Sequence, residues 1–417
     1  MQGFATQEEF FFPQEAVGNG VSWAEGGLLL PSGFRAAAGE AGIRGSRLDC
    51  ALLVSDQAAS SAGVFTKNCV QAAPVLLCRK RVGKNPFRAL LVNSGVANAC
   101  TGAEGLAAAE RVTAGLASLL GCRPEQVLMA STGVIGEPLP VEKIEAILPK
   151  LCTGLSRLAG PAFSRAILTT DTRPKEAAVR VALAEGSVAI GGVAKGAGMI
   201  HPCLATMLAF LTTDAVVPAE ELQGMLEEAV EPTFNAITVD GDTSTNDTVL
   251  LVASGASRVK IRQDSDRERL VRGLKAVCLS LARQIVADGE GATKPVVVRV
   301  LGARGEQQAR QVAKCIANSL LVKTAIAGRD ANWGRILAAA GASGVSFDVD
   351  KVSLQIDGIP VFEDGRPTRL STEDEGRIFR RPVVEIELHL GQGDGQTIVY
   401  TCDLTEEYVR INAHYRS

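Results

Sequence analysis

Apolar runs bounded by turn residues alternate with amphipathic stretches through the first half of the chain. The runs RALLVNSG and QVLMAS have the length and apolar character of buried strands, and the stretches that follow them carry apolar residues at helical spacing. The first such stretch is rich in Ala and Leu and closes at Gly121, and Pro140 opens the second. The pattern predicts strands at 88–95 and 126–131 and helices at 102–121 and 141–151. We expect the second strand to break at Thr132-Gly133.

The second half shows the same kinds of pattern without repeating the sequence. It predicts strands at 206–215, 295–303, 383–390 and 397–402, and helices at 218–230, 266–288 and 305–321. This alternation predicts an α/β protein with mixed sheets, built as two halves of about two hundred residues that meet near residue 206. The sequence shows no Pro-, Gly- or Ser-rich linker between them and no repeat of about 20–50 residues.

The composition is that of a globular protein with a sizeable core. Of the 417 residues, 46% are hydrophobic and 21% are charged, and the formal net charge of −3 favours neither a nucleic-acid surface nor a membrane surface. The chain starts without a basic segment followed by an apolar core, and no apolar run approaches the roughly 18 residues of a membrane span. The 10 cysteines form no CxxC pair, so we expect buried, reduced thiols and a cytoplasmic location.

One polar residue interrupts the apolar run at 201–214: Thr206, between Ala205 and Met207. If the chain is cut before Thr206, this residue gains a free α-amine beside its own hydroxyl. An α-amine has a pKa of about 8 and acts as a general base near neutral pH, so one residue would supply both nucleophile and base. The alternative is an ordinary β-branched strand residue with a hydrogen-bonded hydroxyl, because strands favour threonine.

Two further segments resemble ligand-binding loops without meeting their requirements. Lys195 lies in the glycine-rich segment 191–198, but a phosphate-binding P-loop needs the lysine directly after its last glycine, followed by Ser or Thr. The segment DGDTSTND at 240–247 begins like a calcium loop, but Thr245 replaces the required glycine and Leu251 the final glutamate. We therefore assign no metal. The acids and hydroxyls of 240–247 either brace loops near the nucleophile or form a plain polar turn.

The segment KGAGMIHPCLATMLAFLTTDA at 195–215 resembles the self-cleaving segment of the ornithine acetyltransferase (glutamate N-acetyltransferase) family of arginine biosynthesis. Other blocks agree in the same order over nearly the whole chain: AGVFTKNCVQAAPV (62–75), LVNSGVANACTG (91–102), ASTGVIGEPLP (130–140), ILTTDTRPK (167–175), FNAITVDGDTSTNDTV (234–249), VADGEGATK (286–294), VKTAIAGRDANWGRI (322–336) and RINAHYRS (410–417). So many matching blocks in the same order are not expected by chance.

The resemblance implies the ornithine acetyltransferase (DmpA/ArgJ-like) fold and self-cleavage between Ala205 and Thr206. The products would be an α chain of residues 1–205 and a β chain of residues 206–417, which stay together in an α2β2 heterotetramer. The implied reaction is ping-pong: the Thr206 hydroxyl takes the acetyl group from N2-acetylornithine and passes it to glutamate. No cofactor is implied. Some members also accept acetyl-CoA as a substrate, and no residue that we can name decides whether this chain does.

The resemblance also transfers functional residues to matching positions. The Thr132 hydroxyl and the Gly133 backbone N–H would form the oxyanion hole, which needs donors fixed in place before the reaction. The implied substrate-binding residues are Thr170, Lys195, Thr206, Glu290, Asn412 and Ser417.

Among these residues, Lys195 suits an α-carboxylate and Glu290 suits the cationic side-chain amine of ornithine. We choose Thr170 over Thr169 and Thr172 in the TTDT block, and the choice matters because neighbouring residues on a strand face opposite ways.

Two other functions stay open. A related self-processing aminopeptidase or amidase would share the terminal threonine but pass the acyl group to water. An uncleaved binding protein would use Thr206 only as a core residue.

Overall fold

The computed structural model of the protein describes residues 4–201 and 207–414. The described chain forms two compact units. The larger unit contains residues 14–235 and 242–285, and the smaller unit contains residues 4–13, 236–241 and 286–414, apart from the undescribed segment. Each unit has its own sheet and its own apolar core.

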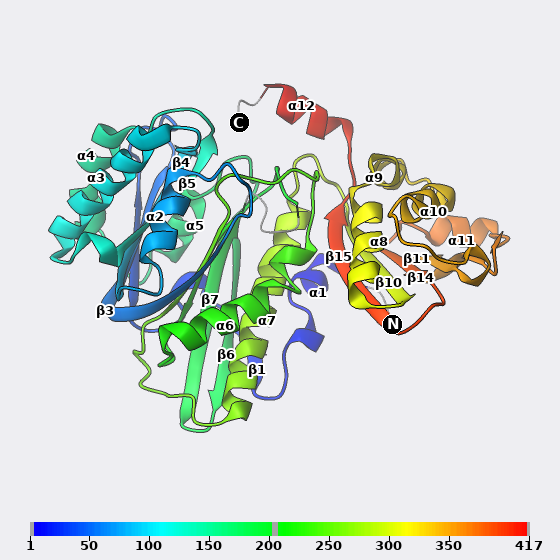
Figure 1. The fold of residues 1–417 in the computed structure, drawn as a ribbon, viewed down its shortest axis with the longest axis horizontal. Helices are drawn as coiled ribbons and strands as arrows, with labels where there is room; N and C mark the ends of the chain where they lie inside the picture. The colour runs from blue at the N-terminus through cyan, green and yellow to red at the C-terminus, as the bar shows by residue number, and fades with distance from the viewer. Residues whose placement is uncertain (1–3, 202–206, 415–417) are drawn as a thin grey trace. The chain divides into compact units, whose positions relative to one another are not determined.

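A nine-stranded mixed sheet forms the centre of the larger unit (Figure 1). Its strands run in the order β1 (Val21–Trp23), β6 (Lys175–Leu183), β7 (Gly186–Lys195), β8 (Leu208–Thr213), β9 (Thr248–Ala253), β3 (Cys50–Phe65), β4 (Phe87–Val96) and β5 (Val127–Val134), with β2 (Phe34–Gly39) paired to β3. β8 lies between antiparallel β7 and parallel β9, and all six of its residues are buried. Burial on both faces explains why the first four residues of β8 are all apolar rather than alternating, and the strand ends in the buried Thr212 and Thr213.

Helices cover this sheet. The elements are α2 (Ala73–Arg81), α3 (Gly102–Leu120), α4 (Val141–Thr153), α5 (Gly160–Ala166), α6 (Ala219–Val230) and α7 (Asp264–Ala287). α3 packs against α2, α4 and β5 (Figure 1). The helix ends where Gly121 adopts the left-handed conformation. The helices predicted at 102–121, 141–151, 218–230 and 266–288 are thus confirmed with small shifts at their ends.

The smaller unit contains a six-stranded sheet in the order β13 (Arg366–Pro367), β12 (Ile359–Glu363), β11 (Ser353–Ile356), β14 (Val384–His389), β10 (Pro295–Ala303) and β15 (Gly395–Cys402). Its helices are α1 (Gln7–Phe11), α8 (Glu306–Asn318), α9 (Leu320–Ala327), α10 (Trp333–Gly341), α11 (Thr372–Arg377) and α12 (Glu406–His414). The single helix predicted at 305–321 is wrong at its end, because the Ser319 side chain accepts from the Val322 N–H and starts a separate helix, α9.

The two halves predicted to meet near residue 206 are not the two compact units. β8 and β9 belong to the second half of the sequence, yet they complete the sheet of the first half, with Lys195 of β7 opposite Leu208 of β8. The fold class, α/β with mixed sheets, is confirmed.

The cysteines differ in part from the expectation. Cys69 and Cys100 are exposed, so the expected burial is wrong for these two, whereas Cys50, Cys78, Cys278 and Cys402 are buried. Within residues 4–201 and 207–414, no helix is both long and apolar enough to cross a membrane.

Candidate active site

Lys195 ends β7 and lies almost completely buried in the larger unit, with 2% of its surface exposed. Its Nζ donates to Oγ1 of Thr169 at 2.7 Å and to Oγ1 of Thr132 at 3.2 Å. One buried ammonium thus joins the predicted oxyanion residue Thr132 to the TTDT block. The resemblance implied a substrate-binding role for Lys195 but did not indicate this contact.

Asp171 balances the charge of this cluster. Its Oδ1 accepts from Lys175 Nζ at 2.7 Å and from the Gly196 N–H at 2.6 Å, and its Oδ2 lies 3.8 Å from Lys195 Nζ. Burial would raise the pKa of the Asp171 carboxyl, but the ammonium groups of Lys175 and Lys195 outweigh that effect and hold the pKa well below its usual range. The cluster therefore contains one ionised carboxylate and two lysines inside the protein.

Thr132 and Gly133 lie inside β5, so the predicted break of the strand at this pair is wrong. The parallel pairing of β5 with β4 continues to Val134 through a register shift, in which Val96 lies opposite both Thr132 and Val134. Gly133 has a φ of 134°, and a Cβ atom on it would lie 2.2 Å from the carbonyl carbon of Gly95. Only glycine fits this irregularity, which reorients the backbone beside Thr132.

The segment 242–247 holds two other parts of the site in place. Asn246 Nδ2 donates to the carbonyl oxygens of Ala97 at 2.7 Å and Ser131 at 2.8 Å, the latter directly before Thr132. Asp247 Oδ1 accepts from the N–H of Met207 at 3.1 Å. Of the acids and hydroxyls predicted to brace loops near the nucleophile, Asp247 thus holds the backbone at Met207, whereas Asn246 is an amide outside that prediction and Thr206 itself lies outside the described residues.

Asp247 is fully buried, and burial raises the pKa of its carboxyl well above the usual range despite the N–H of Met207. The unfolded chain ionises this carboxyl above a pH of about 4, whereas the folded protein keeps the proton to a higher pH, so the contribution of Asp247 to stability decreases as the pH rises. We expect the stability of Asp247→Asn relative to the wild type to increase from about pH 5 to about pH 8 in denaturant titrations, because the amide does not titrate.

Asp171→Asn provides the contrast to that prediction. The pKa of Asp171 is lowered, so its stabilising contribution is present above a pH of about 4 and is lost on acidification. The cost of Asp171→Asn should therefore be largest at neutral pH and shrink in acid. Equal pH trends for the two variants would contradict both assignments.

The TTDT block forms a bend rather than a strand, so the expected alternation of neighbouring threonines between two faces does not apply there. Thr169 N–H donates to Asp171 Oδ2 at 3.0 Å, and its hydroxyl accepts from Lys195. The Arg44 guanidinium donates to the carbonyl oxygens of Leu168 and Thr169 and fixes this bend. Thr170 is half-buried next to these groups.

Glu290 and Asn412 lie together in the smaller unit, where Asn412 Nδ2 donates to Glu290 Oε2 at 2.7 Å. Asn412 belongs to α12, which comes very close to the loop of Glu290: a Cβ atom on Gly291 would lie 2.5 Å from the backbone nitrogen of Tyr408. Thr405 Oγ1 also donates to the Gly291 carbonyl oxygen at 2.6 Å. These contacts hold the C-terminal helix on the loop that carries Glu290.

Three predicted site residues, Ala205, Thr206 and Ser417, lie outside the described residues. Thr132, Gly133, Thr170 and Lys195 all belong to the larger unit.

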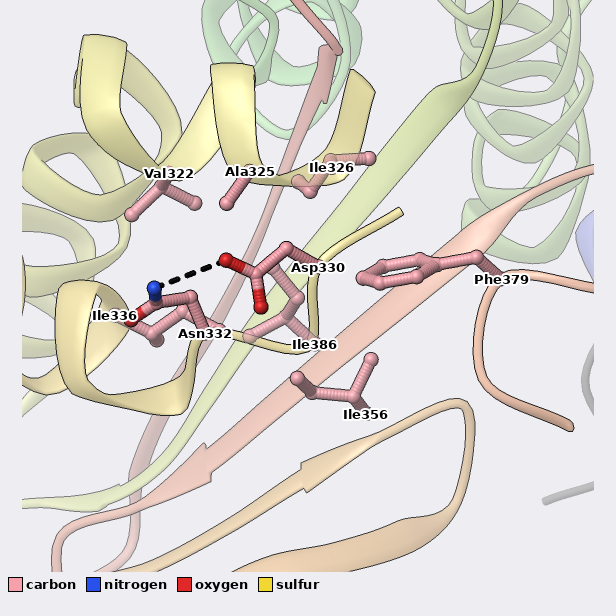
Figure 2. Close-up of a pocket in the computed structure, with 9 residues that line it drawn as sticks. All are labelled: Val322, Ala325, Ile326, Asp330, Asn332, Ile336, Ile356, Phe379 and Ile386. Carbon is pink, nitrogen blue, oxygen red and sulfur yellow. Dashed lines mark hydrogen bonds between the residues drawn. The ribbon is translucent and has the colours of Figure 1, made fainter. Parts of the chain in front are cut away.

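A small cavity in the smaller unit is not a candidate substrate site. Figure 2 shows it between α9, α10 and the sheet, with Asn332 Nδ2 donating to Asp330 Oδ2 at 3.1 Å. Its volume of about 10 Å³ is that of a single water position, and its other lining residues are apolar.

The sequence assigned no role to Arg44, Asp171, Lys175 or Asn246, and for Asp247 it offered only a general bracing role. Asp171 and Lys175 lie in the ILTTDTRPK block, and Asn246 and Asp247 lie in the DGDTSTND block. The signal in the sequence was that these four polar residues lie inside blocks that resemble the family. That signal does not show which group each side chain contacts.

Comparison with known proteins identifies the family. The model of the ArgJ family matches residues 35–417. The arginine biosynthesis bifunctional protein ArgJ of Thermus thermophilus is 51% identical over 394 residues, which cover 93% of this chain and 99% of the relative. The protein of the same name from Thermosynechococcus vestitus is 46% identical over 409 residues, with 94% and 98% covered.

Among solved structures, the arginine biosynthesis bifunctional protein ArgJ of Bacillus halodurans is 43% identical and has a TM-score of 0.47, covering 49% of this chain and 97% of that chain. The match of the family model over residues 35–417, together with relatives of similar length, shows that this chain belongs to the ArgJ family.

Proposed function

We propose that this chain is a self-cleaving acetyltransferase that moves the acetyl group of N2-acetylornithine to glutamate and yields ornithine and N-acetylglutamate. The observation that carries the proposal is the ArgJ family match over residues 35–417, a range that includes every proposed site residue. The curated relatives are named arginine biosynthesis bifunctional proteins, which supports an acyltransferase of this pathway.

In the proposed reaction, Thr206 Oγ attacks the acetyl carbonyl carbon while its proton passes to the Thr206 α-amine. The tetrahedral intermediate places its negative charge on the former carbonyl oxygen, toward the Thr132 hydroxyl and the Gly133 N–H. The C–N bond then breaks, the ornithine nitrogen takes the proton, and an acetyl-threonine ester remains. The neutral amine of glutamate attacks this ester, the amine gives up a proton, and the Thr206 hydroxyl reforms.

We also propose which residues bind the substrate. We assign the α-carboxylate to the region of Lys195 and Thr170, and the cationic side-chain amine of ornithine to Glu290, with Asn412 and Ser417 as further contacts. The hydrogen bond from Asn412 to Glu290 supports a common role for these two residues.

Cleavage between Ala205 and Thr206 gives the α chain of residues 1–205 and the β chain of residues 206–417. The antiparallel pairing of β7 with β8 supports chains that stay joined after the cut, because six residue pairs link the strands on either side of it. We further assign an α2β2 heterotetramer in the cytoplasm. The word bifunctional in the relatives' names supports a second activity, for which we propose acetyl-CoA as acetyl donor to glutamate.

Intact-mass spectrometry of the purified protein tests the proposal. We expect two chains, the second beginning at Thr206, and we expect the second chain to gain the mass of one acetyl group after brief incubation with N2-acetylornithine. Addition of glutamate should remove the adduct and produce N-acetylglutamate.

Two outcomes would count against the proposal. Release of free acetate with no N-acetylglutamate would favour the aminopeptidase or amidase alternative. A single uncut chain near 43.6 kDa would favour an uncleaved binding protein.

A further inference from the structure

The contacts of Lys195 do not resemble those of a lysine that reaches into solvent for a carboxylate. The side chain is buried, and its Nζ donates to the hydroxyl oxygens of Thr132 and Thr169. An ammonium group has donors and no acceptor, so the oxygen of Thr132 must be the acceptor in this contact. The single proton of the Thr132 hydroxyl must therefore point to a different acceptor.

This arrangement matters for an oxyanion hole. A hydroxyl that accepts from a cation becomes a stronger donor through its own proton, because hydrogen bonds in a chain polarise one another in a low-dielectric interior. The neighbouring donor, the Gly133 N–H, is fixed by the backbone irregularity, whereas a threonine hydroxyl rotates unless a contact holds it. Lys195 supplies that contact.

The position of Lys195 is itself fixed by the ion pair behind it. The side chains of Asp171 and Lys175 are fully buried, with Asp171 Oδ1 2.7 Å from Lys175 Nζ, and Asp171 Oδ1 also accepts from the N–H of Gly196, the residue directly after Lys195. Asp171, Lys175 and Lys195 together carry one net positive charge, and the Lys195 ammonium is the part of this group that contacts Thr132.

We propose that Lys195, anchored by Asp171 and Lys175, is a positioning residue of the oxyanion hole that orients and polarises the Thr132 hydroxyl. This inference rests on the proposed function and changes the main task of Lys195 from binding the substrate carboxylate to serving the transition state.

A double-mutant cycle in kcat tests the proposal. The variants are Lys195→Met, which leaves the neutral Asp171–Lys175 pair in place, Thr132→Val, which removes the hydroxyl at similar shape, and the combination of both. Each single variant should lower kcat by about 10²–10³-fold with little change in KM for N2-acetylornithine, because the interaction is made in the transition state. The combination should lower kcat no further than the more damaging single variant, since both changes remove the same interaction.

Multiplication of the two effects, or a raised KM with unchanged kcat in Lys195→Met, would overturn the assignment, because a separate carboxylate contact predicts either result. A wild type that transfers no acetyl group would overturn the proposed function and this inference together. An active wild type with multiplicative losses would overturn this inference alone.

Asp171→Asn provides a second measurement if Lys195→Met fails to fold. We expect its kcat per folded molecule to fall by about 10²-fold with KM nearly constant, because displacement of a positioning group costs rate rather than affinity. The matched control is Asp214→Asn, since Asp214 is also buried and accepts the N–H of Ala189, near the other end of β7, at 2.8 Å. The control should lose thermal stability and keep kcat, and equal kcat values in the two variants would refute the role of Asp171.

Discussion

Replacement of Thr206 by alanine will leave one uncut chain near 43.6 kDa and abolish acetyl transfer. The proposed cut and the proposed turnover both need the same hydroxyl, because it is the nucleophile toward the Ala205 carbonyl first and toward the acetyl carbonyl afterwards. A denaturing gel reports the cut, and formation of N-acetylglutamate from N2-acetylornithine reports the turnover.

Thr206→Ser should retain part of both activities, because serine keeps the hydroxyl. The matched control is Thr213→Val in β8. In the wild type the Thr213 hydroxyl donates to the Ala189 carbonyl oxygen at 2.8 Å. Loss of this buried contact costs about 1 kcal/mol of stability and should leave two chains and normal turnover. Two chains in the Thr206→Ala protein would refute the assignment of the nucleophile.

Replacement of Gly133 by alanine will lower kcat by about 10²–10³-fold, the loss that removal of one oxyanion donor typically gives. The added Cβ would lie 2.2 Å from the Gly95 carbonyl carbon and 2.6 Å from the Val96 nitrogen, and backbone atoms cannot yield as a flexible side chain can. β5 must therefore shift from β4, and the Gly133 N–H must move with it. Steady-state kinetics on N2-acetylornithine, with the folded fraction measured by circular dichroism, check the result.

Gly136→Ala separates this effect from simple backbone strain. Gly136 also has a positive φ, 84°, but a Cβ atom there meets nothing within 4 Å. Its substitution should lower stability by about 1 kcal/mol through backbone strain alone and leave kcat unchanged. Equal losses of kcat in the two alanine variants would show that Gly133 contributes nothing specific to catalysis.

The elements with strong hydrophobic periodicity could be predicted from the sequence. The strand predicted at 295–303 coincides with β10, and the helix predicted at 102–121 ends one residue from α3. The prediction was wrong where long-range pairing decides the structure. β5 continues through Gly133 because β4 supplies a parallel partner, and a local pattern cannot contain that information.

The site shows the same division between local and long-range information. The resemblance implied a role for Thr132 and a role for Lys195 separately. The contact between their side chains joins β5 and β7, which are not adjacent in the sheet. Buried charges such as Asp171 and Lys175 also defeat pattern reasoning, since such residues are ordinarily exposed. Only the three-dimensional pairing shows that each has a compensating partner.

The pairing of β7 with β8 has a consequence for the lifetime of the mature protein. While the chain is intact, these strands find each other within one molecule, at the modest entropic cost of closing a short loop. After the proposed cut, a protein that unfolds releases two separate polypeptides, and recovery becomes a bimolecular reaction that weakens with dilution. The persistence of the processed enzyme would then be governed by how slowly it opens rather than by an equilibrium, and heat-treated samples should regain activity poorly when dilute.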